Sequence, residues 1–549
     1  MSTRTTERRD QNQVEGLGWI IPGLALFVLG CWLLPVTICL LRNGEVPPLT
    51  IPSAVSAVGR LVADGHLANP ADAYPIGVRR TMPDAGGWWL GALWCFACCG
   101  ATGAALMRHV EPQIARERLG RRAWDWRGSR PRPWGRPRDL RQPDADRRGW
   151  SVGRLDGRPI WTDEEAHIAV IAPTRAGKTT RCVIPWLLEH EGPAIVTSTK
   201  RDVLEATRAH RARLGSIWIF DPFNKDRSTW TPLIGCDNWS FALRQAQWLG
   251  DASSDGNNEI ARFWRGEAAK LLAPLLHAAG LARLHMTDVL RWVDTQNLTQ
   301  ASQYLLAARS HAAKDQLTGI EGLDDRNKGT TYMSASAVLA AYRYPEVRAA
   351  SGDDITVEEF LTHPAHTLYV VAAERHQRLL APLVVSLISS MVNGVAEAES
   401  NGWGGGRLRV LLDEAANVAP LSDLPRMLSQ GAGHAIRFAT IWQSIAQLEE
   451  RHGVAAHTVL ANSTAKLLMG PVGDDRTRRM AEQMLARGES PRSGPGIGSD
   501  NSAAMARSLT LLRQGRAVAQ ISDRLPAVVD LEPYWHNRSP IRLSRVGGS

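Results

Sequence analysis

The sequence is poor in cysteine. Seven cysteines occur in 549 residues; five lie in two apolar stretches, and the other two are Cys182 and Cys236. No Cys/His spacing of the metal-binding type is present, so we interpret the thiols as reduced and structural. Apolar residues make up 44% and charged residues 22%. This composition excludes disulfide scaffolds, collagen, coiled coils and disordered chains, and it predicts a large folded core.

Net positive charge is also small over most of the chain. The net charge is +9, but residues 1–107 sum to zero and residues 151–549 contribute only +2. Residues 108–150 hold thirteen arginines and six acidic residues, a local excess of +7. We predict a basic cytoplasmic juxtamembrane linker at 108–150. Contact of its arginines with anionic lipid and contact with nucleic acid both fit this composition.

Two long uncharged runs precede this linker. Residues 17–41 and 86–107 are 25 and 22 residues long and contain no charged side chain. About 20 helical residues cross the apolar core of a bilayer, so both runs predict transmembrane helices. The alternative is a signal peptide followed by a buried core helix. The arginine asymmetry places residues 42–85 outside and both termini in the cytoplasm, which makes residues 1–107 a multi-pass membrane anchor.

A short apolar run is followed by a loop that ends in Gly-Lys-Thr. Residues 167–172 (HIAVIA) predict a buried strand, and the stretch after residues 173–180 (PTRAGKTT) predicts a helix. In a strand–loop–helix unit of this kind, Lys178 reaches the β- and γ-phosphates of a nucleotide and the Thr179 hydroxyl binds Mg²⁺. Ala172 stands where the motif has its first glycine, and alanine fits there if its φ is negative. The predicted nucleotide-binding residues are Thr174, Arg175, Ala176, Gly177, Lys178, Thr179 and Thr180.

A second apolar run ends in two carboxylates. Residues 408–412 (LRVLL) are followed directly by Asp413 and Glu414. We predict that Asp413 holds Mg²⁺ and that Glu414 orients and polarises the attacking water. Taken alone, the pattern also fits a strand that ends in an acidic loop. Residues 438–442 predict a neighbouring strand, after which Gln443 either contacts the γ-phosphate or caps the strand.

The two phosphate motifs are far apart in the sequence. Lys178 and Asp413 are separated by 235 residues, more than a minimal strand–helix core needs. Residues 236–352 show helical spacing without strand-like runs, and strand patterns resume after them. We therefore predict an α/β P-loop NTPase domain, formed by residues 151–235 and 353–549 and interrupted by an all-α insertion domain at 236–352.

Several longer segments give the sequence a specific resemblance. Within residues 411–453 a strand, Asp-Glu, Asp-Leu-Pro and Gln-Ser-x-x-Gln-Leu follow one another, and this order is much more specific than either phosphate motif. The sequence resembles the type IV secretion system coupling proteins, the TraG/TraD-like conjugative DNA transfer ATPases, from the two apolar runs to near residue 540. The other segments that carry the resemblance are APTRAGKTT (172–180), STKRDV (198–203), FDPFN (220–224), TWTPL (229–233) and FWRGEAAKLL (263–272).

This resemblance implies a RecA-like ATPase fold, ATP and Mg²⁺ as ligands, and a ring, usually a homo-hexamer, at the cytoplasmic (inner) membrane. Proteins of this family help to move relaxase-bound single-stranded DNA, or protein cargo, into a type IV secretion channel. Channel components are therefore implied as partners. By motif, Lys178, Thr179, Asp413, Glu414 and Gln443 match the nucleotide residues of the family.

One position departs from the family pattern. Many members carry an arginine that acts across the subunit boundary, and this sequence has Ala432 there. Arg437 and Arg451 are the candidates to replace it; the alternative is that both make structural contacts. Two further functions stay under consideration, the first of them because of this departure and Ala172. They are a nucleotide-binding recruitment scaffold with little turnover and a division-type duplex DNA translocase.

Overall fold

The computed structural model describes residues 148–536 except 253–258, 472–473 and 487–511, together with residues 143 and 144 and scattered residues from 56 to 90. The predicted transmembrane run 17–41 lies outside the described residues. Nearly all of the run 86–107 and of the basic stretch 108–150 lie outside them as well.

The chain divides into two compact units, Met1–Arg130 and Pro131–Ser549. The described part of the first unit includes one short 3-10 helix, η1 (Pro70–Ala73), and a ring contact between Tyr74 and Trp88 at 6.4 Å. The candidate site lies entirely in the second unit.

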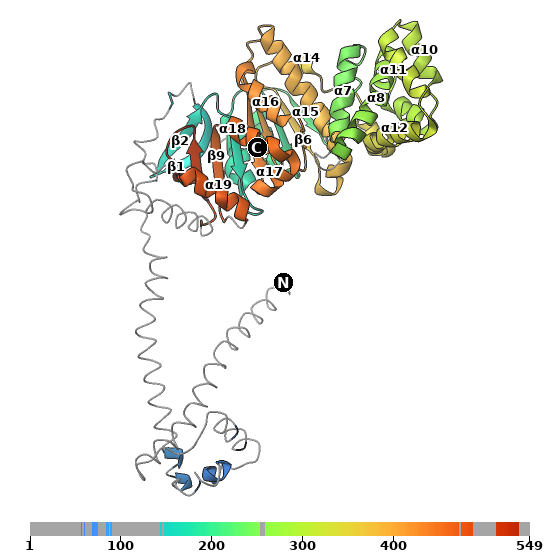
Figure 1. Ribbon diagram of the computed structural model, residues 1–549. Coiled ribbons are helices and arrows are strands. Elements are labelled where there is room, and N and C mark those ends of the chain that lie inside the picture. Colours follow the sequence, from blue (N-terminus) through green and yellow to red (C-terminus); the bar gives the residue numbers. More distant parts are fainter. Residues whose placement is uncertain are drawn as a thin grey trace. The chain divides into compact units, whose positions relative to one another are not determined.

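The second unit is built on one sheet with the strand order β2-β1-β11-β10-β9-β3-β8-β7-β4-β6-β5 (Figure 1). The seven strands from β9 to β5 in this order run parallel to one another, and the other four pair antiparallel. The strands are β1 (Arg148–Leu155), β2 (Arg158–Asp163), β3 (Ile168–Ile171), β4 (Ala194–Ser198), β5 (Ile217–Phe220), β6 (Thr367–Val371), β7 (Leu408–Leu412), β8 (Ile436–Trp442), β9 (Ala465–Met469), β10 (Arg516–Ile521) and β11 (Ala527–Asp530).

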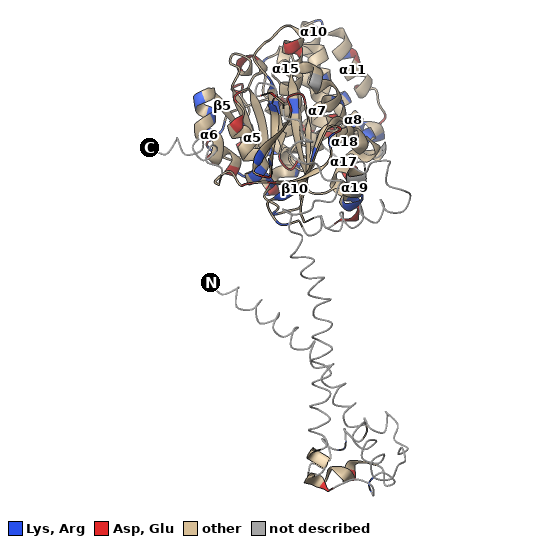
Figure 2. Ribbon diagram, turned by 90° about the vertical axis from the view of Figure 1, so that its left-hand side faces the viewer, with Lys and Arg blue, Asp and Glu red and all other residues tan. Residues whose placement is uncertain are grey.

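The central strands are short apolar runs because helices cover both of their faces. Every residue of β3, β4, β6 and β8 is buried, which is typical of parallel strands covered on two sides. Alternation along β3 directs Val170 into one core and Ile171 into the other. Figure 2 shows α5 and α6 on one side of this unit and α17 to α19 on the other.

The helices occupy the connections between strands. They are η3 (Thr179–Val183), α5 (Ile184–Glu189), α6 (Asp202–Leu214), α7 (Trp239–Asp251), α8 (Glu259–Leu281), α9 (Met286–Thr295), α10 (Thr299–Ala307), α11 (His311–Glu321), α12 (Asp325–Val338), η4 (Leu339–Arg343), α13 (Pro345–Ala349), α14 (Val357–Phe360), η5 (Glu374–His376), α15 (Gln377–Ser400), α16 (Leu424–Gly431), η6 (Ala432–His434), α17 (Ile445–His452), η7 (Gly453–Ala455), α18 (Ala456–Asn462) and α19 (Asp475–Ala486).

Between β5 and β6 all the described elements are helices, α7 to α14. Most of them gather in a lobe beside the sheet (Figure 1). The side chain of Asn238 begins α7 by accepting a hydrogen bond from the Phe241 N–H, as an N-cap does. Leu271 and Leu275 of α8 belong to the same buried cluster as Leu383 of α15, so the lobe and the sheet share one core.

Among the described residues one helical stretch, Glu374–Ser400, is long and apolar enough to cross a membrane. Its most apolar window is 78% buried inside the second unit. Leu387 and Ile388 of this helix are fully covered by the core that contains β6 and β7. The stretch therefore packs as a core helix of the α/β layer.

Candidate nucleotide-binding site

The phosphate loop connects β3 to an uninterrupted helical stretch formed by η3 and α5. Its first residue, Ala172, is fully buried, donates its N–H to the Trp442 carbonyl at 2.9 Å, and is not among the residues with a positive φ. Alanine therefore fits where the motif has glycine. At position 177, by contrast, only glycine fits. Its φ is +85°, and a Cβ on this residue would lie 2.9 Å from Nε of Arg181.

Lys178, Glu414 and Gln443 form one connected group. The ammonium of Lys178 pairs with Glu414 Oε1, and Gln443 Nε2 donates to Glu414 Oε2 at 2.8 Å. The three side chains come from the carboxyl ends of β3, β7 and β8, which are adjacent in the sheet. Parallel strands place their carboxyl ends at one edge, so residues distant in sequence converge there.

Glu414 has a left-handed backbone with a φ of +56°. This conformation is uncommon for a residue with a side chain and costs about 1–3 kcal/mol. The Ala415 N–H donates to the Ile441 carbonyl at 3.1 Å and holds the turn in place. The turn directs the Glu414 carboxylate toward Lys178 and Gln443.

Thr179 and Asp413 form a second pair beside the first. The Thr179 hydroxyl donates to Asp413 Oδ2 at 2.8 Å. Asp413 is 3% exposed, and burial is the main reason why its pKa rises to about 6. Its other oxygen, Oδ1, is buried without a hydrogen-bond partner. A hydroxyl and a carboxylate with a buried free oxygen are the hard oxygen donors that Mg²⁺ takes, so these residues fit that ion.

The remaining predicted residues, Thr174, Arg175, Ala176 and Thr180, all lie in the same loop or at its helical end. Two contacts there involve residues to which the motifs assigned no role, although Gln447 is the second glutamine of the Gln-Ser-x-x-Gln-Leu segment. Gln514 donates through Nε2 to the Arg175 carbonyl at 2.9 Å, and Gln447 accepts from the Gln443 N–H at 2.9 Å. Gln447 lies in the first turn of α17 (Ile445–His452), whose N-cap is Ser444, and its side chain reaches back to the backbone in front of the helix. The Ser-x-x-Gln spacing is a capping-box pattern, and this signal could have been used.

The two candidate arginines are engaged within their own subunit. Arg437 is 4% exposed and donates to the carbonyls of Glu164 at 3.0 Å and Gly431 at 3.2 Å. Arg451 donates to the Pro420 carbonyl. The sequence allowed Arg437 either to act on a neighbouring subunit or to make contacts within its own. The structure favours contacts within its own subunit, because a buried side chain with several hydrogen bonds does not reach a neighbour.

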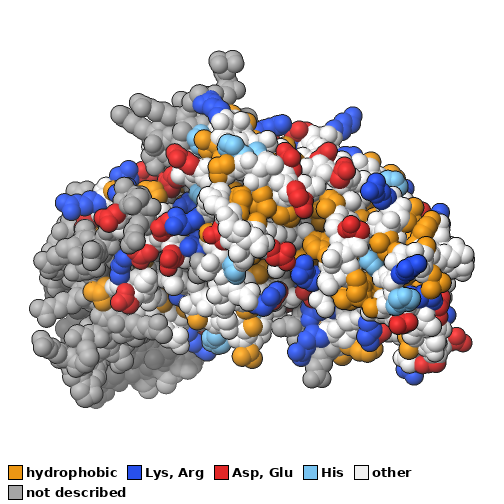
Figure 3. Space-filling model, turned by 90° about the horizontal axis from the view of Figure 1, so that it is seen from above, with side chains coloured by type: hydrophobic (Ala, Val, Ile, Leu, Met, Phe, Trp, Pro, Cys, Tyr) orange, Lys and Arg blue, Asp and Glu red, His pale blue; other side chains and the backbone are white. Residues whose placement is uncertain are grey.

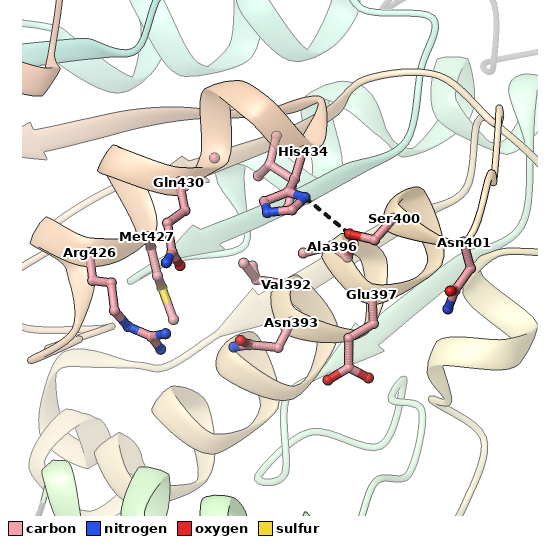
Figure 4. Close-up of a pocket in the computed structure, with 12 residues that line it drawn as sticks. Val392, Asn393, Ala396, Glu397, Ser400, Asn401, Arg426, Met427, Gln430 and His434 are labelled. Carbon is pink, nitrogen blue, oxygen red and sulfur yellow. Dashed lines mark hydrogen bonds between the residues drawn. The ribbon is translucent and has the colours of Figure 1, made fainter.

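The segment that contains Ala432, at the position of the arginine found in many members of the family, borders a cavity. This cavity has a volume of about 420 Å³ and lies between α15 and α16, and Gly431 and His434 are among its lining residues. Figure 4 shows His434 directed toward Ser400 at the end of α15, and their Nδ1 and Oγ atoms are 3.4 Å apart. The lining also includes Glu397 and Arg426, which pair with Arg244 and Asp423 respectively. None of the residues of the phosphate loop lines this cavity.

The fold and this constellation define a P-loop nucleotide-binding protein of the RecA-like α/β type with helical additions. Residues 136–484 match the family described as "Type IV secretory system Conjugative DNA transfer". Because this match covers more than half of the chain, the chain belongs to that family.

Curated relatives are similar over part of their length. "Conjugal transfer protein TraG" of Escherichia coli is 24% identical over 327 residues, which are 53% of this chain and 50% of that protein. "Protein VirD4" of Agrobacterium fabrum is 24% identical over 346 residues, 59% of this chain and 50% of that protein. The chain thus spans about half the length of the curated relatives it matches.

Solved structures show the same fold. "Bacterial conjugative coupling protein TrwBdeltaN70" superposes with a TM-score of 0.56 at 18% identity, over 72% of this chain and 90% of that one. The structure of "Plasmid coupling protein TrwB in complex with ADP and Mg2+" superposes with a TM-score of 0.55 at 19% identity, over 72% and 90% of the two chains.

Proposed function

We propose that this protein is a membrane-anchored ATPase that couples a substrate to a type IV secretion channel and drives its transfer. One observation carries the proposal: Lys178, Thr179, Asp413, Glu414 and Gln443 meet at one edge of the sheet in a chain of the conjugative transfer family. The substrate class we infer is relaxase-bound single-stranded DNA or a protein, as the family implies.

The domain organisation we propose follows the sequence. Residues 1–107 anchor the chain in the cytoplasmic membrane with both termini in the cytoplasm, and residues 108–150 link the anchor to the ATPase. Residues 151–235 and 353–549 form the ATPase domain, and the helical segment 236–352 is its insertion. We further propose that six copies form a ring that meets channel components at the membrane.

The chemistry we infer begins with an exchange of partners. Lys178 is paired with Glu414 in the structure, and a γ-phosphate would compete for its ammonium. Glu414 would then keep Gln443 as a hydrogen-bond donor and accept the proton of an attacking water. Thr179 and Asp413 would hold Mg²⁺, which supplies charge neutralisation to the phosphates.

Among the described residues, the surface charge on the face shown in Figure 3 does not select a DNA-binding site. On the face shown in Figure 3, basic and acidic side chains are interspersed over the described residues. Residues 151–549 sum to only +2. A strongly basic stripe would be the electrostatic footprint of a nucleic-acid surface on a single subunit. We therefore assign DNA contact to the assembled ring and not to one face of the subunit.

ATP turnover by the detergent-purified full-length protein tests the proposal. We expect turnover that single-stranded DNA stimulates and that Glu414→Gln lowers by a factor of about 10²–10⁴, the usual contribution of a general base. Stimulation by duplex DNA alone would favour a duplex translocase. Nucleotide binding without turnover in any condition would favour the recruitment scaffold, which Ala432 and the buried Arg437 keep in consideration.

A further inference from the structure

The segment that follows β11 lies against the phosphate loop on the side away from the carboxylates. In the sheet, β3 has β8 and β7 on one side, and these strands lead into Gln443, Asp413 and Glu414. On its other side β3 has β9, β10 and β11. Residues 531–536 continue from β11 and end in Tyr534, Trp535 and His536.

One carbonyl that has no partner within the helix binds this segment. In η3 the Ile184 N–H donates to the Thr179 carbonyl, five residues back. The same pattern would pair the Thr180 carbonyl with residue 185, but Pro185 has no N–H. The Tyr534 N–H donates to this free carbonyl instead, at 3.0 Å.

The side chain of Arg181 in η3 and one backbone hydrogen bond reinforce the contact. Arg181, the residue after Thr180, donates to the Leu531 carbonyl. Gly515, the residue before β10, lies so close to Arg181 that a Cβ on Gly515 would be 2.9 Å from Nη1 of Arg181. The Leu531 N–H donates to the Gly515 carbonyl at 2.7 Å. The phosphate loop, β10 and the segment after β11 are thus tied together.

The aromatic side chains on this segment differ in exposure. Tyr534 is half-buried and packs against the core that contains Ala176 and Val183. Trp535 is 47% exposed, and its ring centroid lies 5.2 Å from that of Tyr534 in an edge-to-face arrangement. A large ring is therefore presented to solvent one residue beyond the contact with Thr180.

We propose that Trp535 is the stacking surface for the base of the nucleotide, an inference that rests on the proposed function. Lys178 takes the β- and γ-phosphates on the carboxylate side of the loop, so the nucleoside end extends past Thr180 and Arg181 to the opposite side. Trp535 lies on that side. Stacking tolerates any base, so ATP and GTP are both expected to bind.

Calorimetric titration of the detergent-purified full-length protein tests this inference, with ATP and inorganic tripolyphosphate as separate probes in the presence of Mg²⁺. Trp535→Ala is expected to raise the Kd for ATP about tenfold and to leave the Kd for tripolyphosphate unchanged. Trp535→Phe should restore most of the affinity for ATP. Trp264→Ala, which removes an exposed ring of the helical lobe, serves as the matched control and should change neither value.

An unchanged Kd for ATP in Trp535→Ala would overturn the inference. Equal weakening of ATP and tripolyphosphate would also overturn it, because that result indicates damage to the loop. Photo-crosslinking with 8-azido-ATP should label a peptide that contains residues 534–536, and labelling confined to other peptides would count against Trp535. A wild-type protein that binds neither probe would overturn the proposed function itself, and this inference with it.

Discussion

At the scale of single residues, two side-chain pairs organise the site. The Lys178–Glu414 ion pair has side chains only 11% and 15% exposed. Thr179 and Asp413 lie directly beside it. Removal of one member of a buried pair leaves the other charge without its partner, which costs more than removal of both.

A double substitution at this pair gives the first prediction. Lys178→Met alone should destabilise the protein, because Glu414 then keeps a charge with no cation beside it. Lys178→Met combined with Glu414→Gln should recover about 1–3 kcal/mol of that loss. Denaturant unfolding of the four proteins in the cycle measures the coupling, and a coupling near zero would show that the pair does not contribute to folding.

Buried histidines give a second prediction, for acid conditions. His167 accepts the Phe438 N–H through Nδ1, and burial lowers its pKa to about 4. Between pH 6.5 and 4 the unfolded chain binds a proton at this histidine and the folded protein does not, so the contribution of His167 to stability falls by roughly 3 kcal/mol as the pH drops through this window. Asp413 acts in the opposite sense, because its pKa is raised to about 6.

Melting temperatures from pH 7 to pH 4.5 check this prediction. His167→Asn keeps a hydrogen-bond acceptor near the Phe438 N–H and cannot titrate. The fall in melting temperature with pH should therefore be shallower in this variant than in the wild type. Parallel pH profiles for the two proteins would refute the assignment to His167.

At the scale of helices and strands, residue patterns predicted the parallel centre of the sheet better than its antiparallel extension. The runs 167–172, 408–412 and 438–442 contain or match β3, β7 and most of β8 because strands buried on both faces are continuously apolar. β1 has intermediate and glycine positions and begins in the arginine-rich stretch, so it shows no such run. Its turn at Asp156-Gly157, with φ of +52° and +77°, was a readable hairpin signal.

The residues that we propose for the site could be chosen from the sequence because their motifs are local, whereas the contacts that support them are not. Gln514 reaches the Arg175 carbonyl from 339 residues away, and Tyr534 reaches the Thr180 carbonyl from a similar distance. Both use general hydrogen-bonding groups that occur throughout the chain. Only the strand order β10-β9-β3 brings them to the loop, and strand order is a property of the whole sheet.

Arg211 of α6 gives a prediction at this scale. Its side chain is fully buried and donates to Thr367 Oγ1 at 2.8 Å and to the Gly192 and Ala365 carbonyls at 2.6 and 3.0 Å. It thereby ties α6 to the starts of β4 and β6. Arg211→Met should destabilise the protein by about 3 kcal/mol, because several buried acceptors lose their donor.

Denaturant unfolding measures this effect. Arg208 lies one turn earlier on α6, has a side chain 51% exposed, and pairs with Asp226. Arg208→Met is the matched control and should change stability by less than about 0.5 kcal/mol. Similar losses in the two variants would mean that the buried network does not account for the effect.

At the scale of the whole molecule, the sequence left open whether an arginine reaches the nucleotide site of a neighbouring subunit in the proposed ring. Because Arg437 is buried and bonded to backbone carbonyls, Arg437→Ala should lower the melting temperature. The turnover per folded subunit should change less than twofold. Turnover measured after normalisation to the folded fraction checks this, and a loss of about 10³-fold would restore Arg437 as the acting residue.

Subunit mixing tests the proposed ring directly. In a ring, neighbouring sites depend on one another. In co-purified mixtures of wild type and Lys178→Ala, turnover should therefore fall more steeply than the fraction of wild-type subunits. A strictly proportional decline would indicate that the subunits hydrolyse ATP independently.

The strand order also has a consequence for synthesis of the chain. β3 lies at the centre of the sheet, yet its neighbours β8 and β9 begin at residues 436 and 465. At about 5–20 residues per second, a ribosome needs roughly 15–50 s after β3 to deliver β8. During that interval β3, whose four residues are all apolar and buried in the folded protein, has neither neighbour, so we expect the nascent chain to expose an apolar segment until most of it has been translated.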